Sequence, residues 1–189
     1  ITATTPTSIW TGTENLSVGH GAWDTYFNGT IDEVRIYNRA LNQSEIQQDM
    51  NSAYPVVRPV ASYRFEEGSG NVAQDSHIWV KGVSGSALSF DGINDYVNAG
   101  NGTSLQISGT NPITYEAWVK SSPLGVYQMI VAKSTNWKGY DLSITDVNKM
   151  RFGVVKDSGN YNTAISINTI GTEWTHVVGT YNGSVIRGI

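Results

Sequence analysis

Several residue types and patterns are missing or scarce in this chain of 189 residues, and each absence excludes a class of protein. Cysteine is absent, which excludes disulfides, thiolate catalysis and cysteine-based zinc sites. Charged residues make up only 15% of the chain, with a net charge of −4, and lysines and arginines stand singly. Without a basic stripe, no nucleic-acid partner is expected. No apolar run approaches the roughly 20 residues of a membrane helix, so we expect no membrane insertion in this segment.

The paired carboxylates of a glycosidase are also missing. Glycoside hydrolysis needs two carboxyl groups roughly 5 to 9 Å apart, which on one strand requires acidic residues at alternating positions. Asp32 and Glu33 are adjacent, so they should point to opposite faces, and we expect them to be solvated. The three histidines stand in no nucleophile motif. The sequence therefore predicts a protein that is not an enzyme.

What the chain does contain is a succession of short segments rich in Val, Ile, Thr and aromatic residues, separated by Gly, Asn, Ser or Asp. In "ITYEAWVK", residues 113, 115, 117 and 119 point one way and the residues between them the other. Strands that recur every 8 to 12 residues or so, without intervening helices, are typical of sandwiches and jelly rolls. The predicted fold class is all-β, a two-sheet antiparallel jelly-roll sandwich with one short helix.

The one helical segment is "LNQSEIQQDM". Asn42 is a suitable N-cap, Glu45 stands three residues later as in a capping box, and Leu41, Ile46 and Met50 can face the body. After it, residues 53–59 contain two prolines and read as an extended connector.

From residue 60 onward the chain resembles the front of a laminin G-like domain, of the concanavalin A-like, pentraxin-related jelly-roll superfamily. The resemblance rests on "VASYRFEEGSGNVAQDS", "GSALSFDGINDYVNAGN", "ITYEAWVK", "IVAKSTNWKGYDLSI", "MRFGVV" and "WTHVVGTYNGS", in this order. The segment "SIWTGTENLSVGHGAWDTYFNGTIDEVRIYNRALNQSEI" resembles the back of the same domain. The two parts thus stand in reverse order.

This order predicts three segments. Residues 1–52 are the C-terminal part of a laminin G-like repeat, residues 53–59 a linker, and residues 60–189 the N-terminal part of a repeat, with part of one hairpin missing. A piece of about fifty residues buries too little surface to fold alone. We expect one jelly roll, either permuted and closed within the chain, or strand-swapped with a neighbouring copy.

The resemblance implies calcium at one end of the sandwich, held by the loops "STNWKGYDLS" and "SVGHGAWDTYFNG". In this chain the candidate ligands are Asp24, Asn136 and Asp141. Calcium takes six to eight oxygen ligands, so main-chain carbonyls and water would have to complete the site. Calcium is the only cofactor considered.

The same two loops carry the residue types of a sugar site. Aromatic faces stack on sugar rings, while carboxylate, amide and imidazole groups bind hydroxyls. The alternatives are that these aromatic residues cap the end of the sandwich or contact a protein. The candidate carbohydrate-binding residues are His20, Trp23, Asp24, Tyr26, Asn136, Trp137 and Tyr140.

Five Asn-x-Ser/Thr sequons suit an extracellular or cell-surface setting, although a chain rich in these residues produces some by chance. The possible glycosylation sites are Asn15, Asn28, Asn42, Asn101 and Asn182. The predicted function is noncatalytic adhesion, with a glycan or a surface protein as partner. The alternative is a structural repeat of a stalk or filament, assembled by donating a segment to neighbouring copies of itself.

Overall fold

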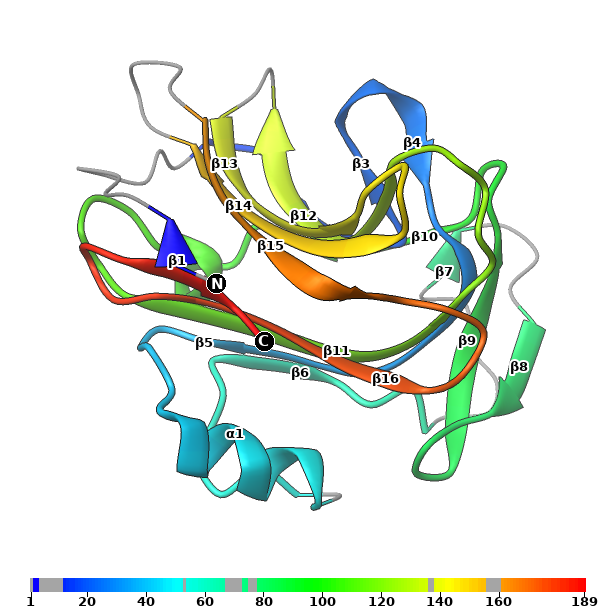
Figure 1. Cartoon of the computed structure of the whole chain (residues 1–189), viewed down its shortest axis with the longest axis horizontal. Coiled ribbons are helices and arrows are strands. Elements are labelled where there is room, and N and C mark those ends of the chain that lie inside the picture. The colour runs from blue at the N-terminus through cyan, green and yellow to red at the C-terminus, as the bar shows by residue number, and fades with distance from the viewer. Residues whose placement is uncertain are drawn as a thin grey trace.

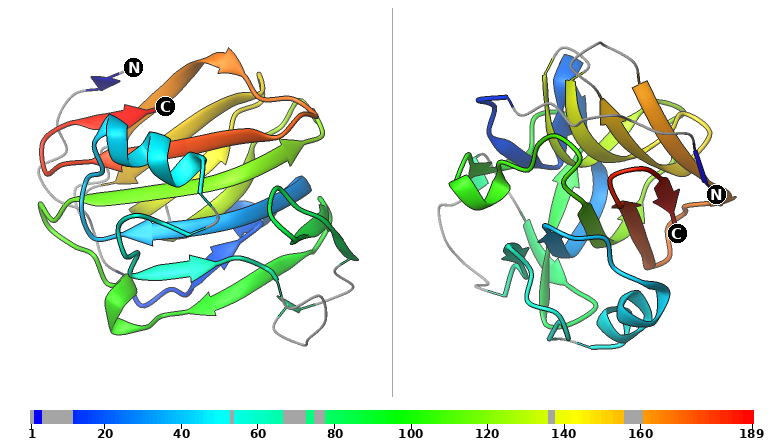
Figure 2. Two further views of the ribbon diagram at one scale, coloured as in Figure 1. Left: turned by 90° about the horizontal axis from the view of Figure 1, so that it is seen from below. Right: turned by 90° about the vertical axis from the view of Figure 1, so that its left-hand side faces the viewer.

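The computed structural model describes residues 2–3, 12–52, 54–66, 73–74, 78–135, 138–155 and 161–189. Within these residues, two antiparallel β-sheets lie face to face, as the side view in Figure 2 shows. The predicted all-β sandwich is therefore confirmed.

The eight-stranded sheet has the order β1-β17-β16-β11-β5-β9-β8, and β6 also pairs with β5. Its strands are β1 (Thr2–Ala3), β17 (Ile186–Gly188), β16 (Thr175–Tyr181), β11 (Ile113–Ser121), β5 (Asn28–Tyr37), β9 (Ser86–Asp91), β8 (Ile78–Lys81) and β6 (Ala61–Tyr63).

The seven-stranded sheet has the order β15-β14-β13-β12-β2-β10-β7. Its strands are β15 (Tyr161–Thr169), β14 (Lys149–Val155), β13 (Lys138–Ile144), β12 (Gln128–Thr135), β2 (Leu16–Val18), β10 (Tyr96–Gly100) and β7 (Ala73–Gln74). A small separate hairpin consists of β3 (His20–Gly21) and β4 (Thr25–Tyr26), joined by the 3-10 turn η1 (Ala22–Asp24); a second such turn is η2 (Thr103–Leu105). In Figure 1 this hairpin rises from the outer, concave side of the seven-stranded sheet.

The core lies between the sheets and follows the alternation seen in the sequence. Ile113, Tyr115, Ala117 and Val119 of β11 are all buried in the main apolar cluster. The inner face of the opposite sheet supplies Phe152 among others, and its ring meets that of Tyr115 edge to face at 6.3 Å. This inward-facing alternation is what holds the two layers together.

Residues 12–52 supply a strand to the interior of each sheet. β2 lies between β12 and β10, and β5 lies between β11 and β9. β1 pairs with β17, so the two ends of the chain lie side by side (Figure 1). A single chain can therefore close both sheets by itself; exchange of the N-terminal segment with a neighbouring copy stays a prediction.

The predicted helix is α1 (Gln43–Met50), with the capping box confirmed. The side chain of Asn42 accepts a hydrogen bond from the Glu45 N–H at 3.0 Å, and the Glu45 carboxylate accepts one from the Asn42 N–H at 2.9 Å. Ile46 is buried against the sheet, but Met50 is 37% exposed, so its expected inward orientation is wrong. Figure 2, seen from below, shows α1 lying across the outer face of the eight-stranded sheet.

A buried polar cluster joins α1 to that sheet. The guanidinium of Arg35 donates to the carboxylates of Glu33 at 2.7 Å and Glu116 at 3.2 Å, and to the main-chain oxygen of Asp49 at 3.2 Å. The Tyr37 hydroxyl donates to the Asp49 carboxylate at 2.7 Å. Removal of any one member of this cluster is expected to be strongly destabilising, because it leaves a buried charge without a partner.

The expectation that Asp32 and Glu33 are solvated is wrong. Both are buried, and Glu33 has a φ of 48° at the point where the pairing of β5 with β11 shifts register. The Asp32 carboxylate accepts hydrogen bonds from the N–H groups of Glu33 at 2.7 Å and Val83 at 2.8 Å. Asp32 therefore anchors the turn between β8 and β9, and Glu33 is a partner of Arg35.

These buried groups predict how stability depends on pH. Burial raises the pKa of Glu116, beside Arg35, Tyr37 and Asp49, to about 7. Burial likewise raises the pKa of Asp32 to about 6, and burial lowers the pKa of His176 to about 4. Between roughly pH 4.5 and 6, the folded chain keeps two carboxyl protons that the unfolded chain has released, while unfolded histidine holds one proton that the folded chain lacks.

Burial also lowers the pKa of His20, so two histidines oppose the two carboxyls. We therefore predict the behaviour of variants. Relative to the unmodified chain, Glu116→Gln should shift the slope of unfolding free energy against pH upward between about pH 4.5 and 7, and His176→Gln should shift it downward. Urea unfolding at a series of pH values measures both slopes, and the same slope in both variants would contradict the assignment.

No helix among the described residues is long and apolar enough to cross a membrane.

Candidate functional site

The hairpin β3–β4 stands on the seven-stranded sheet because two glycines allow close contact at its base. Gly19 has a φ of +82°, and a Cβ there would lie 2.4 Å from the ring of Phe90. A Cβ on Gly21 would lie 2.4 Å from Cγ of Met129, on β12. The Phe27 N–H donates to the Gly19 carbonyl at 2.9 Å, which closes the hairpin. Side chains larger than hydrogen would lift the hairpin off the sheet.

A groove of about 540 Å³ lies between this hairpin and the sheet. Strands β2, β10 and β12 form its floor, and the hairpin and the segment before β2 form its walls. The lining residues are Glu14, Asn15, Ser17, His20, Gly21, Ala22, Asp24, Tyr26, Tyr96, Asn98, Ala132 and Ser134. The size is in the range of sites that hold small ligands.

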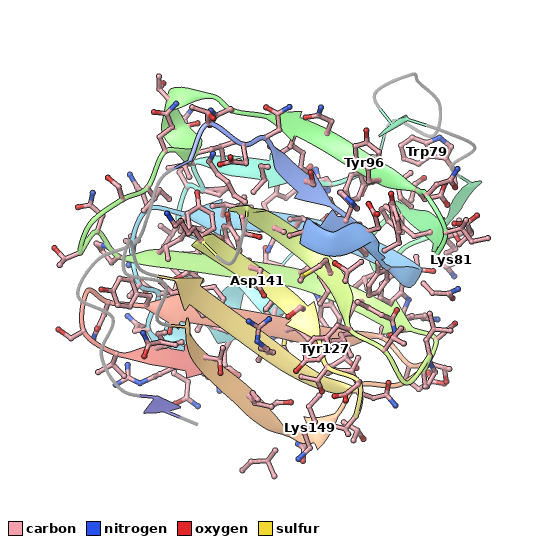
Figure 3. The ribbon with its side chains drawn as sticks, turned by 90° about the horizontal axis from the view of Figure 1, so that it is seen from above. Trp79, Lys81, Tyr96, Tyr127, Asp141 and Lys149 are labelled. Carbon is pink, nitrogen blue, oxygen red and sulfur yellow. The ribbon has the colours of Figure 1, made fainter. Side chains whose placement is uncertain are left out.

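Three rings stand together in this groove. His20 lies 4.7 Å from the ring of Tyr26 and 5.3 Å from that of Tyr96, measured between centroids. Figure 3, seen from above, shows Tyr96 beside the hairpin. Burial lowers the pKa of His20, partly opposed by the charge of Asp24, so the imidazole is neutral near neutral pH.

Two polar atoms of the groove residues are buried without a hydrogen-bond partner in the described structure. They are Oε2 of Glu14 and Nε2 of His20. The Lys133 ammonium instead donates to the main-chain oxygen of Glu14 at 2.6 Å and to Oδ1 of Asn101 at 2.8 Å. Buried polar atoms normally have partners, so these two are candidates for contact with a ligand.

The structure brings together three of the predicted carbohydrate-binding residues, His20, Asp24 and Tyr26, which all line the groove. The main chain of Trp23 lies in η1, between the two strands of the hairpin, but its side chain lies outside the described residues. Asn136 and Trp137 also lie outside the described residues.

The prediction that Tyr140 binds carbohydrate is wrong. It is only 1% exposed, its ring meets that of Tyr115 edge to face at 5.2 Å, and its hydroxyl donates to the Leu105 carbonyl at 2.6 Å. Tyr140 and Leu142 are two residues apart on β13, so both side chains lie on the face of the strand that is buried in the core. Tyr140 therefore packs the sandwich and is inaccessible to a sugar.

The prediction that Asp141 shares a calcium site with Asp24 is also wrong. It faces the outer side of the seven-stranded sheet, where Figure 3 shows it over the middle of the sheet, but it is 1% exposed. Its carboxylate accepts hydrogen bonds from Arg151 at 2.9 Å and from the Ser143 hydroxyl at 3.0 Å. Asp141 does not line the groove that contains Asp24, so these two predicted calcium ligands do not share a site.

Among the residues that the structure describes, no group of three or more histidine, aspartate or glutamate side chains could hold a metal ion. Asp24 is exposed, with a φ of 51°, and is the one predicted ligand with an accessible described side chain. Calcium stays a prediction that depends on Asn136.

The asparagines of the five sequons differ in their exposure and in whether their side-chain amides donate hydrogen bonds. Asn15 and Asn182 are exposed, and Asn42 caps α1. The amide of Asn28 donates to the Asp91 carbonyl at 2.7 Å, and that of Asn101 to the Thr13 carbonyl at 3.1 Å. Attachment of a glycan would disrupt these last two bonds, so the exposed sequons are the better candidates.

Sequence reasoning missed Glu14, Tyr96 and Asn98. Tyr96 and Asn98 alternate on β10, so their shared face was visible in "DYVNAG". The sequence did not show whether that face would point to the core or to the groove, because this depends on the pairing of β10 with β2, about 80 residues away in sequence.

The comparison with known families agrees with this architecture. The sequence profile of the laminin G-type family described as the concanavalin A-like lectin/glucanases superfamily matches residues 1–47 and 91–188. Because the match covers most of the chain, the protein belongs to this family. Neither a curated protein nor a solved structure matches the chain significantly. Membership of a lectin-type family indicates a module that binds carbohydrate or protein.

Proposed function

We propose that the protein is a noncatalytic carbohydrate-binding module and that the groove beside the hairpin β3–β4 is its site. The observation that carries the proposal is the pairing of two buried, unpartnered polar atoms with a cluster of three rings in one groove. A sugar offers both complements, since its ring has an apolar C–H face and its edge carries hydroxyl donors.

The roles of the residues follow from their chemistry. Sugar hydroxyls donate to Oε2 of Glu14 and, in the tautomer with the proton on Nδ1, to Nε2 of His20. The rings of Tyr26 and Tyr96 contact the apolar face of the sugar. Asn98, which is exposed at the groove, offers both an amide donor and an amide acceptor.

The charge of the groove selects among glycans. Among the described residues, its lining includes two carboxylates, Glu14 and Asp24, and neither lysine nor arginine. Sulfated or uronic-acid glycans would place like charges together in a partly buried site. The preferred glycans are therefore neutral or carry an amino group.

The wider setting belongs to the same proposal. The module acts in adhesion at a cell surface or in the extracellular space, with a glycan or a glycosylated surface protein as partner. The alternative is a structural repeat that is joined to its neighbours by exchange of residues 1–52. In that arrangement β2 and β5 would form the same strand pairs, but with the sheets of a neighbouring copy. An assembled polymer indifferent to sugars would favour this alternative.

The test is binding to an array of neutral, amino and anionic glycans, followed by titration of the best ligand. We expect Tyr26→Ala and Glu14→Gln each to weaken binding at least tenfold, which corresponds to about 1.4 kcal/mol. The matched control is Tyr54→Ala, because Tyr54 is 72% exposed and does not line the groove. Unchanged binding in both groove variants would exclude the groove, and failure of all glycans would favour a protein ligand.

A further inference from the structure

The groove beside the hairpin β3–β4 has a negatively charged lining with one hydrogen-bond acceptor that no protein group uses. Among the described residues, the lining contains the carboxylates of Glu14 and Asp24 and no lysine or arginine. Oε2 of Glu14 is buried and has no hydrogen-bond partner in the described structure. A carboxylate oxygen accepts hydrogen bonds and does not donate them. A ligand that fills the groove therefore has to bring a donor to Glu14.

The cation beside Glu14, Lys133, does not supply this donor. An ammonium group has three protons. Those of Lys133 go to the main-chain oxygens of Gly12 at 3.3 Å and Glu14 at 2.6 Å, and to Oδ1 of Asn101 at 2.8 Å. Lys133 is 2% exposed and does not line the groove. Its charge offsets part of that of Glu14, but Asp24 adds a second carboxylate at the groove.

The donor that a sugar brings to Glu14 is either a hydroxyl or an ammonium. A hydroxyl completes the hydrogen bond, whereas an ammonium completes it and also supplies the opposite charge in a partly buried site. The rings of Tyr26 and Tyr96 favour the ammonium too, because the face of an aromatic ring attracts a cation. Burial lowers the pKa of His20, which stands between these rings, so its imidazole adds no positive charge at neutral pH.

We propose that the groove binds an amino sugar whose amine is free, with the ammonium at Glu14 and the ring face against Tyr26 and Tyr96. This inference rests on the proposed function and narrows its ligand to glycans that carry an unacetylated amine. The amine of such a sugar lies at the edge of the ring, so the apolar face and the ammonium can meet both parts of the groove together. N-acetylation keeps an N–H donor but removes the charge, so acetylated sugars bind less tightly.

The test compares three methyl glycosides that differ only at one ring carbon, namely methyl glucosaminide, methyl N-acetylglucosaminide and methyl glucoside. Each is titrated into the whole chain slightly below neutral pH, where the amine is protonated, and NMR signals of Tyr26 and Tyr96 report binding. EDTA is present to keep divalent cations off the carboxylates. We expect the glucosaminide to bind at least tenfold more tightly than the other two, a difference of about 1.4 kcal/mol.

Glu14→Gln keeps the size of the side chain but removes its charge, so it should abolish most of this preference. The matched control is Glu173→Gln, which changes the net charge of the chain by the same amount. Glu173 is exposed and does not line the groove, so the preference should be unchanged.

Equal binding of the three glycosides would overturn this inference and leave the proposed function intact. If neither these glycosides nor any longer glycan binds, both are wrong. A preference for the amine that persists in Glu14→Gln would contradict the role of Glu14. Binding of N-acetyl-lysine methylamide as tightly as the glucosaminide would show that the groove recognises an ammonium without a sugar, which also overturns the inference.

Discussion

Replacing Arg35 with methionine is expected to lower the free energy of unfolding by about 3 to 5 kcal/mol at about pH 8, where the Glu116 carboxyl is ionised. The guanidinium of Arg35 is 2% exposed and donates to both Glu33 and Glu116, whose side chains are also buried. Methionine fills a similar volume but leaves these two carboxylates without their buried cation. The carbonyls of Asp49 and Ser52 lose hydrogen bonds as well, so the contact between α1 and the sheet weakens.

Urea unfolding followed by fluorescence measures the loss, with Arg39→Met as the matched control. Arg39 also pairs with a glutamate, Glu45, but its side chain is 38% exposed. An exposed pair of this kind contributes about 0 to 1 kcal/mol. Similar losses of unfolding free energy in the two variants would show that burial does not determine how much the Arg35 cluster stabilises the fold.

The second large effect is expected at Gly29. Gly29→Ala should cost about 2 to 5 kcal/mol, from backbone strain together with a steric clash. Gly29 has a φ of +142°, which side chains rarely allow, and a Cβ there would lie 2.0 Å from the carbonyl oxygen of Lys120. That oxygen belongs to the neighbouring strand β11, in the middle of the eight-stranded sheet, so it cannot move away without breaking strand pairing.

The control is Gly125→Ala. Gly125 also has a positive φ, +69°, but a Cβ there would have no atom within 4 Å. Only the conformational cost remains, about 1 kcal/mol. If thermal unfolding gave the same loss for both glycines, the close approach of Gly29 to Lys120 would not be the cause.

Some features of the molecule could be predicted from single segments. The capping box of α1 involves Asn42 and Glu45, three residues apart, so its geometry is local. The inward alternation in β11 was also predictable, because a strand with one face in a core shows its period directly in the sequence.

The errors came from faces and partners that lie far apart in sequence. Tyr140 and Asp141 are neighbours in an aromatic and polar loop sequence, yet the first points into the core and the second is covered on the outer face. Asp32 and Glu33 were expected to be solvated, but Asp32 accepts a hydrogen bond from Val83 in the turn after β8. The partner of Glu33, Arg35, is itself bonded to Glu116 of β11. No local pattern specifies such partners, because burial depends on which strands become neighbours.

The sequence by itself determined the all-β class, the helix with its cap, the family, and the loop that carries His20, Asp24 and Tyr26. These depend on periodicity and on short-range hydrogen bonds, which a linear chain records. Only the tertiary structure decided that Glu14 and Tyr96 complete the groove and that Asp32 is buried against the turn after β8. Both depend on the pairing of strands from distant parts of the chain, which the free energy of the whole sandwich selects.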